Sequence, residues 1–203
     1  MSKAIEQLMT EHRLIEQVLG SLETFVENVE KGAEADRRTV RDYADFFRNF
    51  ADKCHHGKEE DRLFVKMTEF GFPKEYGPIA VMLAEHEQGR EHVSALAAIG
   101  NRDGALANGE RAEVIRHALE YVPLLRAHIM KEDNILYPMA LQTIPQTEMD
   151  KMGAAFDDFE ATEMGDGTHE RFHKLAESLI VAYPPDPEKM DQASACIGCA
   201  GHM

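Results

Sequence analysis

The sequence of 203 residues contains no tryptophan and only three cysteines, Cys54, Cys196 and Cys199. Cysteines so few and so unevenly spaced do not make a disulfide framework. The chain also lacks a run of about eighteen apolar residues, and its first residues are polar and amphipathic rather than the apolar core of a signal peptide. We therefore expect a cytoplasmic protein.

Basic residues are few as well. The chain has 22 Lys and Arg against 37 Asp and Glu, which gives a formal net charge of −15. Nucleic acid and anionic membrane both require a basic surface, so neither is an expected partner. No motif in the sequence indicates a protein partner.

Helical periodicity dominates the rest of the chain. Apolar residues recur with a period of about 3.6 almost throughout, and the alternation typical of strands is nearly absent. The pattern predicts helices over residues 2–30, 36–69, 76–99 and 107–141, with one or two more in 145–182, interrupted at Gly165-Asp166-Gly167. Pro123 lies inside the fourth helix, where we expect a kink or a local widening.

Chain length and connection length predict how these helices are arranged. A chain of 203 residues suits one domain with a short appendage. Short connections make neighbouring helices antiparallel. We therefore expect an all-α fold: an up-down-up-down antiparallel four-helix bundle at residues 1–141, a helical extension packed on it at 142–183, and a flexible tail with Cys-x-x-Cys at 184–203.

Two segments of the chain repeat a metal-ligand pattern. Each contains His-x-x-x-Glu, at His55/Glu59 and at His128/Glu132, and an aromatic residue follows each Glu five positions later. Residues four apart lie on one face of an α-helix, so each pair presents an imidazole and a carboxylate to a common point. Two such helices facing each other can hold two metal ions.

Two further histidines, His12 and His86, occupy the apolar stripes of the first and third helices. A single core histidine is more often a hydrogen-bonded structural residue than a ligand. Histidines on all four helices, with two carboxylates in register, favour a metal site, because burying Glu59 or Glu132 unpaired would cost on the order of several kcal/mol.

His55 and His56 compete for one role. Counting back from His55 by helical turns gives the apolar Ala51 and Phe47, whereas the same count from His56 gives polar residues. Periodicity therefore places His55 and Glu59 inward, and His56 and Glu60 in a second layer or at the surface. The alternative, in which His56 and Glu60 take the inward role, stays open.

The ligand types restrict the metal. Mixed imidazole and carboxylate ligation suits iron, manganese or zinc. Four His and two Glu shared by two ions leave coordination positions open, unlike a closed structural zinc site. Two bridging carboxylates with terminal histidines describe a di-iron centre, and open positions on ferrous iron imply binding of O2, NO or peroxide.

The residues that carry this pattern resemble the hemerythrin-like (HHE cation-binding) domain family over about residues 1–141. The motifs are His12, the block Cys54–Phe64, the block Glu85–Arg90 and the block His128–Pro138. The resemblance implies a non-haem centre of two iron ions. It assigns Glu59 and Glu132 as bridges, His12 and His128 as ligands of one ion, and His55 and His86 as ligands of the other.

One departure from the family's oxygen carriers bears on function. Those proteins have a second histidine one turn after the third-helix ligand, where this chain has Arg90. The site therefore resembles the members that act in iron-centre repair and bacterial stress response, and simple reversible O2 storage is in doubt. Arg90 is either a salt-bridged core cation or a group that stabilises a bound anion.

The resulting expectation is a di-iron protein that binds or senses O2, NO or peroxide in oxidative or nitrosative stress or in iron homeostasis. The alternatives are a peroxide-removing or ferroxidase-like enzyme and an iron-storage module without turnover. No catalytic residue is predicted. His169 and His173, and the Cys196/Cys199 pair, remain weaker candidates for metal or redox roles, and Tyr121 is expected in the core.

Overall fold

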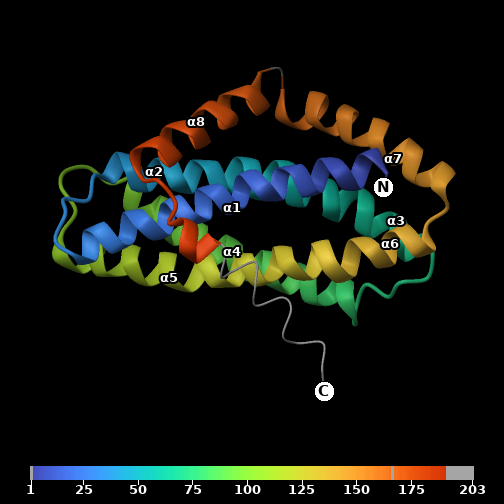
Figure 1. The fold of residues 1–203 in the computed structure, drawn as a ribbon, viewed down its shortest axis with the longest axis horizontal. Helices are drawn as coiled ribbons and strands as arrows, with labels where there is room; N and C mark the ends of the chain where they lie inside the picture. Colours follow the sequence, from blue (N-terminus) through green and yellow to red (C-terminus); the bar gives the residue numbers. More distant parts are fainter. Residues whose placement is uncertain (1, 166, 191–203) are drawn as a thin grey trace.

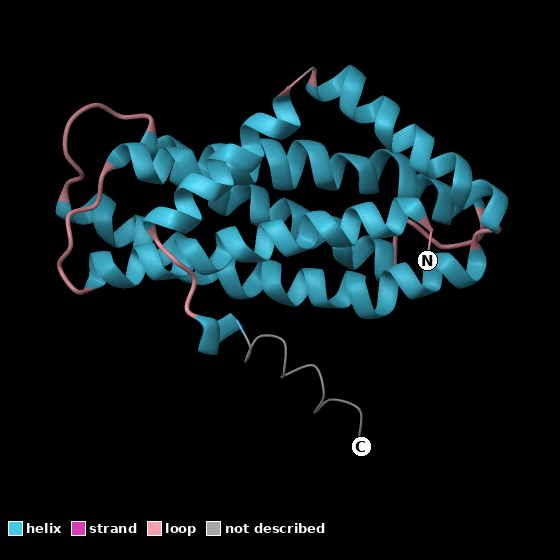
Figure 2. Ribbon diagram, turned by 45° about the horizontal axis from the view of Figure 1, so that its top comes forward, coloured by secondary structure: helices cyan, strands magenta, loops and turns pink. Residues whose placement is uncertain are grey.

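The first expected helix forms α1, Lys3–Glu30, in a computed structural model that describes residues 2–165 and 167–190. The Ser2 hydroxyl caps it by accepting a hydrogen bond from the backbone N–H of Ile5 at 3.3 Å. All regular structure in the described residues is helical, as predicted (Figure 2). None of the described helices is both long enough and apolar enough to cross a membrane.

The second expected helix is one continuous rod built from α and π segments. It consists of α2 (Arg37–Phe46), η1 (Phe47–His56), η2 (Glu59–Leu63) and α3 (Phe64–Glu69). A π-helix closes hydrogen bonds between residues five apart, so it is wider than an α-helix and is most often found at functional sites. The periodicity of the sequence did not predict these segments.

The third and fourth rods close the bundle. α4 spans Pro78–Gly100, and the last rod consists of α5 (Asn108–Lys131), η3 (Glu132–Leu136) and α6 (Tyr137–Thr143). The α-helix continues through Pro123, and the widening that we expected at that residue lies instead at η3, after the second His/Glu pair.

The rods lie side by side along the long axis of the molecule (Figure 1). α2 packs against α4, α4 against α5, α5 against α1, and α1 against η1. The extension consists of α7 (Gln146–Phe159), η4 (Glu160–Met164) and α8 (Thr168–Ala182), which cover one side of the rods.

Residues 184–190, which we expected to begin the flexible tail, contact α1. Pro185 and Met190 lie against Gly20, and Lys189 forms an ion pair with Glu27. Cys196, Cys199 and the remainder of the predicted tail from residue 191 onward lie outside the described residues.

The apolar core is divided into two clusters along the rods. One cluster contains Leu19, Phe25, Phe46 and Tyr121, and the other contains Leu8, Phe64, Leu136 and Phe156. The buried histidines and glutamates come between these clusters on every rod. Apolar packing on both sides therefore holds this polar layer in place.

Candidate metal centre

The structure brings the six predicted ligands together in the layer between the two apolar clusters. Each has a relative exposure of 1% or less. They come from all four rods: His12 from α1, His55 from η1, Glu59 from η2, His86 from α4, His128 from α5 and Glu132 from η3. The bundle thus gathers them from residues far apart in the sequence.

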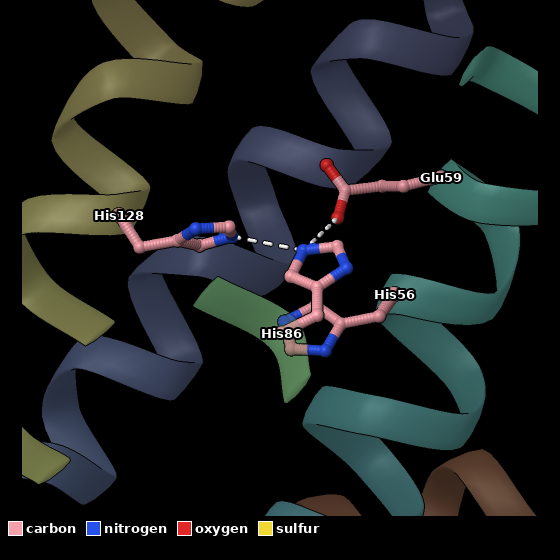
Figure 3. A group of neighbouring side chains, drawn as sticks. All are labelled: His56, Glu59, His86 and His128. Atoms are coloured by element: carbon pink, nitrogen blue, oxygen red, sulfur yellow. Dashed lines mark hydrogen bonds and ion pairs between the residues drawn. The ribbon is translucent and has the colours of Figure 1, made fainter. Parts of the chain in front are cut away.

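One half of the centre contains His56, Glu59, His86 and His128 (Figure 3). The Nε2 atom of His86 lies 3.0 Å from Nε2 of His128 and 3.6 Å from Oε2 of Glu59. The ring of His56 stacks on that of His86, with centroids 3.8 Å apart. Possible ligand atoms of all four residues lie within 4.8 Å of one another.

The other half contains His12, His55, Glu59 and Glu132. The Nε2 atom of His12 lies 3.3 Å from Oε2 of Glu132, and Nε2 of His55 lies 3.7 Å from Oε2 of Glu59. The two imidazole rings are 4.5 Å apart, centroid to centroid. This group presents two imidazole nitrogens and two carboxylates to one point, whereas the first group presents three imidazoles and one carboxylate.

The two glutamates connect the halves. Glu59 belongs to both groups. Glu132 points one oxygen each way, with Oε1 3.1 Å from Nε2 of His128 and Oε2 3.3 Å from Nε2 of His12. The arrangement is suited to carboxylates that each serve two cations.

The grouping of the histidines differs from the one that the resemblance implied. His12 lies beside His55 rather than sharing an ion position with His128, and His86 lies beside His128 rather than beside His55. Ligand order along the chain does not determine which rings meet. That depends on the direction in which each rod points its side chain, which only the packed structure shows.

His56 lies closer to the centre than periodicity indicated. We expected it in a second layer or at the surface, but it is only 4% exposed and is one of the four residues of the first group. Both His55 and His56 lie in the π-helical η1, where the wider turn lets adjacent histidines face inward together. The adjacent His-His pair was the only signal in the sequence. Glu60, in contrast, does lie in the second layer, where it contacts His86.

Every histidine of the centre has its Nδ1 atom beside a carboxylate. The partners are Asp133 for His12 (2.8 Å), Glu11 for His55 (2.9 Å), Asp52 for His56 (3.3 Å), Glu60 for His86 (2.6 Å) and Glu85 for His128 (2.9 Å). Such bonds fix the ring orientation and raise the basicity of the other nitrogen, as is usual for metal-binding histidines. In this centre they leave Nε2 of His12, His55, His86 and His128 facing the glutamates.

A basic side chain holds each of these carboxylates in turn. Arg13 binds Asp133, Lys58 binds Glu11, Lys131 binds Glu85, and Arg90 binds both Asp52 and Glu60. Arg90 also pairs with Glu87 at 2.6 Å. Its guanidinium is therefore committed to carboxylates, which corresponds to the salt-bridged role rather than to binding an anion.

Four buried atoms of the centre accept or donate no hydrogen bond within the described part of the chain. They are Nε2 of His55, Oε2 of Glu59 and both carboxylate oxygens of Glu132. Leaving buried carboxylate oxygens without a donor is costly, and cations between these atoms would remove that cost. The donor set, imidazole nitrogens with carboxylate oxygens, fits divalent iron, manganese or zinc.

The protonation of the glutamates depends on their surroundings. Burial and the adjacent Glu132 raise the pKa of Glu59 well above its usual range. Burial also raises the pKa of Glu132, but His128, His12 and His86 outweigh it and hold that pKa well below its usual range. The pKa values of the two glutamates are therefore shifted in opposite directions in the metal-free centre.

The histidines divide in a similar way. Burial, together with nearby imidazoles, lowers the pKa of His55 well below its usual value and that of His56 to about 3. Burial opposes the charge on His128 too, but Glu132 and Glu85 raise its pKa to about 9. His55 and His56 are thus neutral at pH 7, as metal ligands must be.

Tyr137 is a residue of the centre that the sequence analysis did not select. Its hydroxyl donates a hydrogen bond to Oε1 of Glu59 at 2.6 Å, and its ring is stacked beside His12 at 5.5 Å. The signal was present as the aromatic residue that follows each His/Glu pair. Tyr121, expected in the core, is 2% exposed and packs edge-on against Phe47.

A small cavity of about 40 Å³ adjoins one half of the centre. Its lining includes His56, His86, Arg90 and Tyr121. The cavity has room for water or another small ligand beside the two histidines.

The weaker candidates lie elsewhere. His169 and His173 pack on the ring of Phe50, and His169 approaches Glu11 and Glu160. The ammonium group of Lys58 already bonds both of those carboxylates. Cys54 is buried, and burial raises the pKa of its thiol to about 12, so it is an unreactive core residue.

The comparisons with known proteins agree with this geometry. The hemerythrin HHE cation binding domain family matches residues 3–140. The chain is also similar to the uncharacterized protein Rv1995 of Mycobacterium tuberculosis and the uncharacterized protein Mb2018 of Mycobacterium bovis, each 22% identical over 92% of this chain and 69% of the relative. No solved structure matches the chain significantly. The chain belongs to the hemerythrin HHE cation-binding domain family, and its buried histidine and glutamate clusters are able to bind metal.

Proposed function

We propose that the protein holds two iron ions in this centre and uses them to bind or sense O2, NO or peroxide, in oxidative or nitrosative stress or in iron homeostasis. The observation that carries the proposal is the set of five histidines, each held at Nδ1 by a carboxylate, around two fully buried glutamates. The short connections between rods also support the antiparallel up-down-up-down order.

The residues divide between two ion positions. His56, His86 and His128 would hold one ion, His12 and His55 the other, and Glu59 and Glu132 would serve both. Iron bound there supplies reversible one-electron chemistry and open positions for a small ligand. The chain orients the imidazoles through the carboxylates at their Nδ1 atoms, and its apolar clusters keep bulk water away.

The size of the adjoining cavity supports a small ligand. The cavity of about 40 Å³ beside His56 and His86 has room for a diatomic molecule or peroxide. The guanidinium of Arg90 is held by three carboxylates and is therefore not free to stabilise a bound anion. We therefore favour binding or sensing of a small ligand over turnover of an anionic one.

A redox enzyme that removes peroxide or oxidises ferrous iron is the second candidate. Tyr137 favours it, because its hydroxyl lies 2.6 Å from Glu59 and is in a position to move a proton at the centre. Turnover of peroxide or of added ferrous iron by the purified protein separates this candidate from the first.

The test is metal analysis combined with absorption spectra of the full chain. We expect two iron ions per chain and an oxo-bridged di-iron absorption in the oxidised protein that shifts on addition of azide, NO or peroxide. A colourless protein that binds only zinc, or spectra that ignore all three ligands, would overturn the proposal. Binding of many more than two ions would indicate storage.

A further inference from the structure

The two halves of the centre are built on the same relay of charges. Lys58 and Lys131 each directly precede a buried glutamate in the repeated segments. Lys58 binds Glu11, which holds Nδ1 of His55, and Lys131 binds Glu85, which holds Nδ1 of His128. In both repeats, the lysine thus supports the histidine three residues before it.

The two relays differ in their surroundings. The side chain of Lys131 is 28% exposed and that of Glu85 is 16% exposed, so water reaches this relay. The side chain of Lys58 is 0% exposed. It also has a second partner, because its ammonium group lies 2.5 Å from Oε1 of Glu160. Glu160 belongs to η4 of the extension, outside the residues 3–140 that match the family.

The extension is fixed where it meets this relay. Gln7 of α1 donates a hydrogen bond to Oε1 of Glu160 at 2.8 Å. The ring of Phe159 packs against Gly57, so closely that a Cβ there would lie 2.7 Å from Cζ of Phe159. The absence of a side chain at Gly57 therefore lets the extension approach the metal-bearing rod.

This contact makes the charge of the two relays unequal. Lys131 with Glu85 combines one cation and one carboxylate and is neutral, whereas Lys58 with Glu11 and Glu160 combines one cation and two carboxylates and has a net charge of −1. The side chains of Lys58 and Glu11 are 0% and 5% exposed, whereas that of Glu160 is 23% exposed, so water screens the added charge in part. A negative charge in that position favours a cation at the His12/His55 half.

We propose that Glu160 is a positioning residue through which the C-terminal extension strengthens metal binding at the His12/His55 half. It acts through Lys58 and Glu11 and touches no proposed ligand. This inference rests on the proposed two-ion centre and adds a role for the extension, which the family match does not cover.

The experiment titrates the metal-free full chain with Co²⁺ without oxygen and follows the visible spectrum, which reports the ligand field of each ion. The variants are Glu160→Gln, which removes the charge, and Glu160→Asp, which keeps it. The matched control is Glu163→Gln, an exposed carboxylate in the same η4 segment. Glu85→Gln is the corresponding change in the second layer of the other half.

We expect the wild type to bind two Co²⁺ ions. Glu160→Gln should weaken the ion at the His12/His55 half by roughly threefold to tenfold, less than the loss found when a direct partner of a ligand is removed. Glu160→Asp should restore much of it, and Glu163→Gln should change nothing. Glu85→Gln should instead weaken the ion at the His128 half.

Two kinds of failure can be told apart. If the wild type binds two ions and Glu160→Gln binds both as tightly as Glu163→Gln does, the role of Glu160 is wrong and the centre stands. If the wild type binds fewer than two ions, the proposed centre itself is wrong. Equal circular dichroism and melting temperature of the metal-free variants exclude a change in folding as the cause.

Discussion

The ring of His56 lies flat on the ring of His86, with centroids 3.8 Å apart and planes 11° apart. The pair joins the second rod to the third, and Arg90 supports it by binding Asp52 and Glu60, the carboxylates at the two Nδ1 atoms. The second rod thus contributes a second histidine, besides His55, to the buried polar layer.

The first prediction concerns His56. Replacement by Leu introduces an apolar side chain of similar size that has no nitrogen to bind a metal. The variant should therefore lose one metal ion and keep the other. Metal analysis of the purified variant measures this. His173→Leu, in α8 and outside the centre, is the control and should keep both ions. Full metal content in His56→Leu would return His56 to a second-layer role.

The second prediction concerns the carboxylates. Glu59→Ala or Glu132→Ala should reduce the metal content to one ion or none, because each side chain contributes to both halves. Glu60→Ala should have a smaller effect, since Glu60 contacts Nδ1 of His86 and not the centre itself. A variant series in which Glu60→Ala empties the site and Glu59→Ala does not would reverse the assignment of the two residues.

The sequence was sufficient to predict the rods and the depth at which the ligands lie. The apolar stripe of α1 and the paired His-x-x-x-Glu segments indicate which residues face the core, because residues that recur at helical spacing share the buried face of a helix. His12, His55, His86 and His128 are accordingly all buried at 1% exposure or less.

The remainder could not be predicted from a period of 3.6 residues. Counting back from His56 by helical turns correctly placed Asp52 on the same face, where it holds Nδ1 of His56. His56 itself is buried, however, and not exposed, and it lies in the π-helical η1. Glu160 contacts Lys58 across 102 positions of sequence, and no local pattern indicates such a contact. The contacts between side chains on different rods are therefore set by tertiary packing and not by local sequence patterns.

The third prediction concerns removal of metal. Bound ions stabilise the folded state by mass action, so chelation should lower the melting temperature by about 10–20 °C if both ions are at about 100 times their dissociation constant. The helices should remain, because the two apolar clusters lie outside the centre. Circular dichroism before and after chelation tests both statements, and complete loss of helix on chelation would contradict the second.

The fourth prediction concerns pH and the Arg37–Glu110 pair. Arg37 at the start of α2 donates to Glu110 at 2.5 Å and to backbone carbonyls of Ile99, Gly104 and Ala105, which fixes the connection between α4 and α5. The hydrogen bonds from Arg37 and from the Ala107 backbone lower the pKa of Glu110 from 4.5 to about 2.

Because the folded-state pKa of Glu110 is lowered, its contribution to stability is present above pH 4.5 and is lost as the pH falls towards 2. Glu110→Gln should therefore lower the melting temperature at pH 7, and the difference from the wild type should shrink between pH 4.5 and 2. Melting curves of both proteins across this range measure it. A difference that stays constant down to pH 2 would show that Glu110 acts through packing and not through its charge.

The last prediction concerns a close approach between two rods. A Cβ at Gly100, the last residue of α4, would lie 2.7 Å from the backbone N of Arg41 and 2.8 Å from its Cα in α2. Backbone atoms cannot rotate away, so Gly100→Ala should force α2 and α4 apart at a cost of about 1–3 kcal/mol, which exceeds the roughly 0.5–1 kcal/mol that Ala gains over Gly in a helix. Gly109, in the first turn of α5, has nothing within 4 Å of the position that a Cβ would take, so Gly109→Ala should be neutral or stabilising. Urea unfolding of the two variants isolates the steric effect, because both make the same chemical change in a helix. If both variants gained stability equally, α2 and α4 would have to be farther apart at this point than the structure places them.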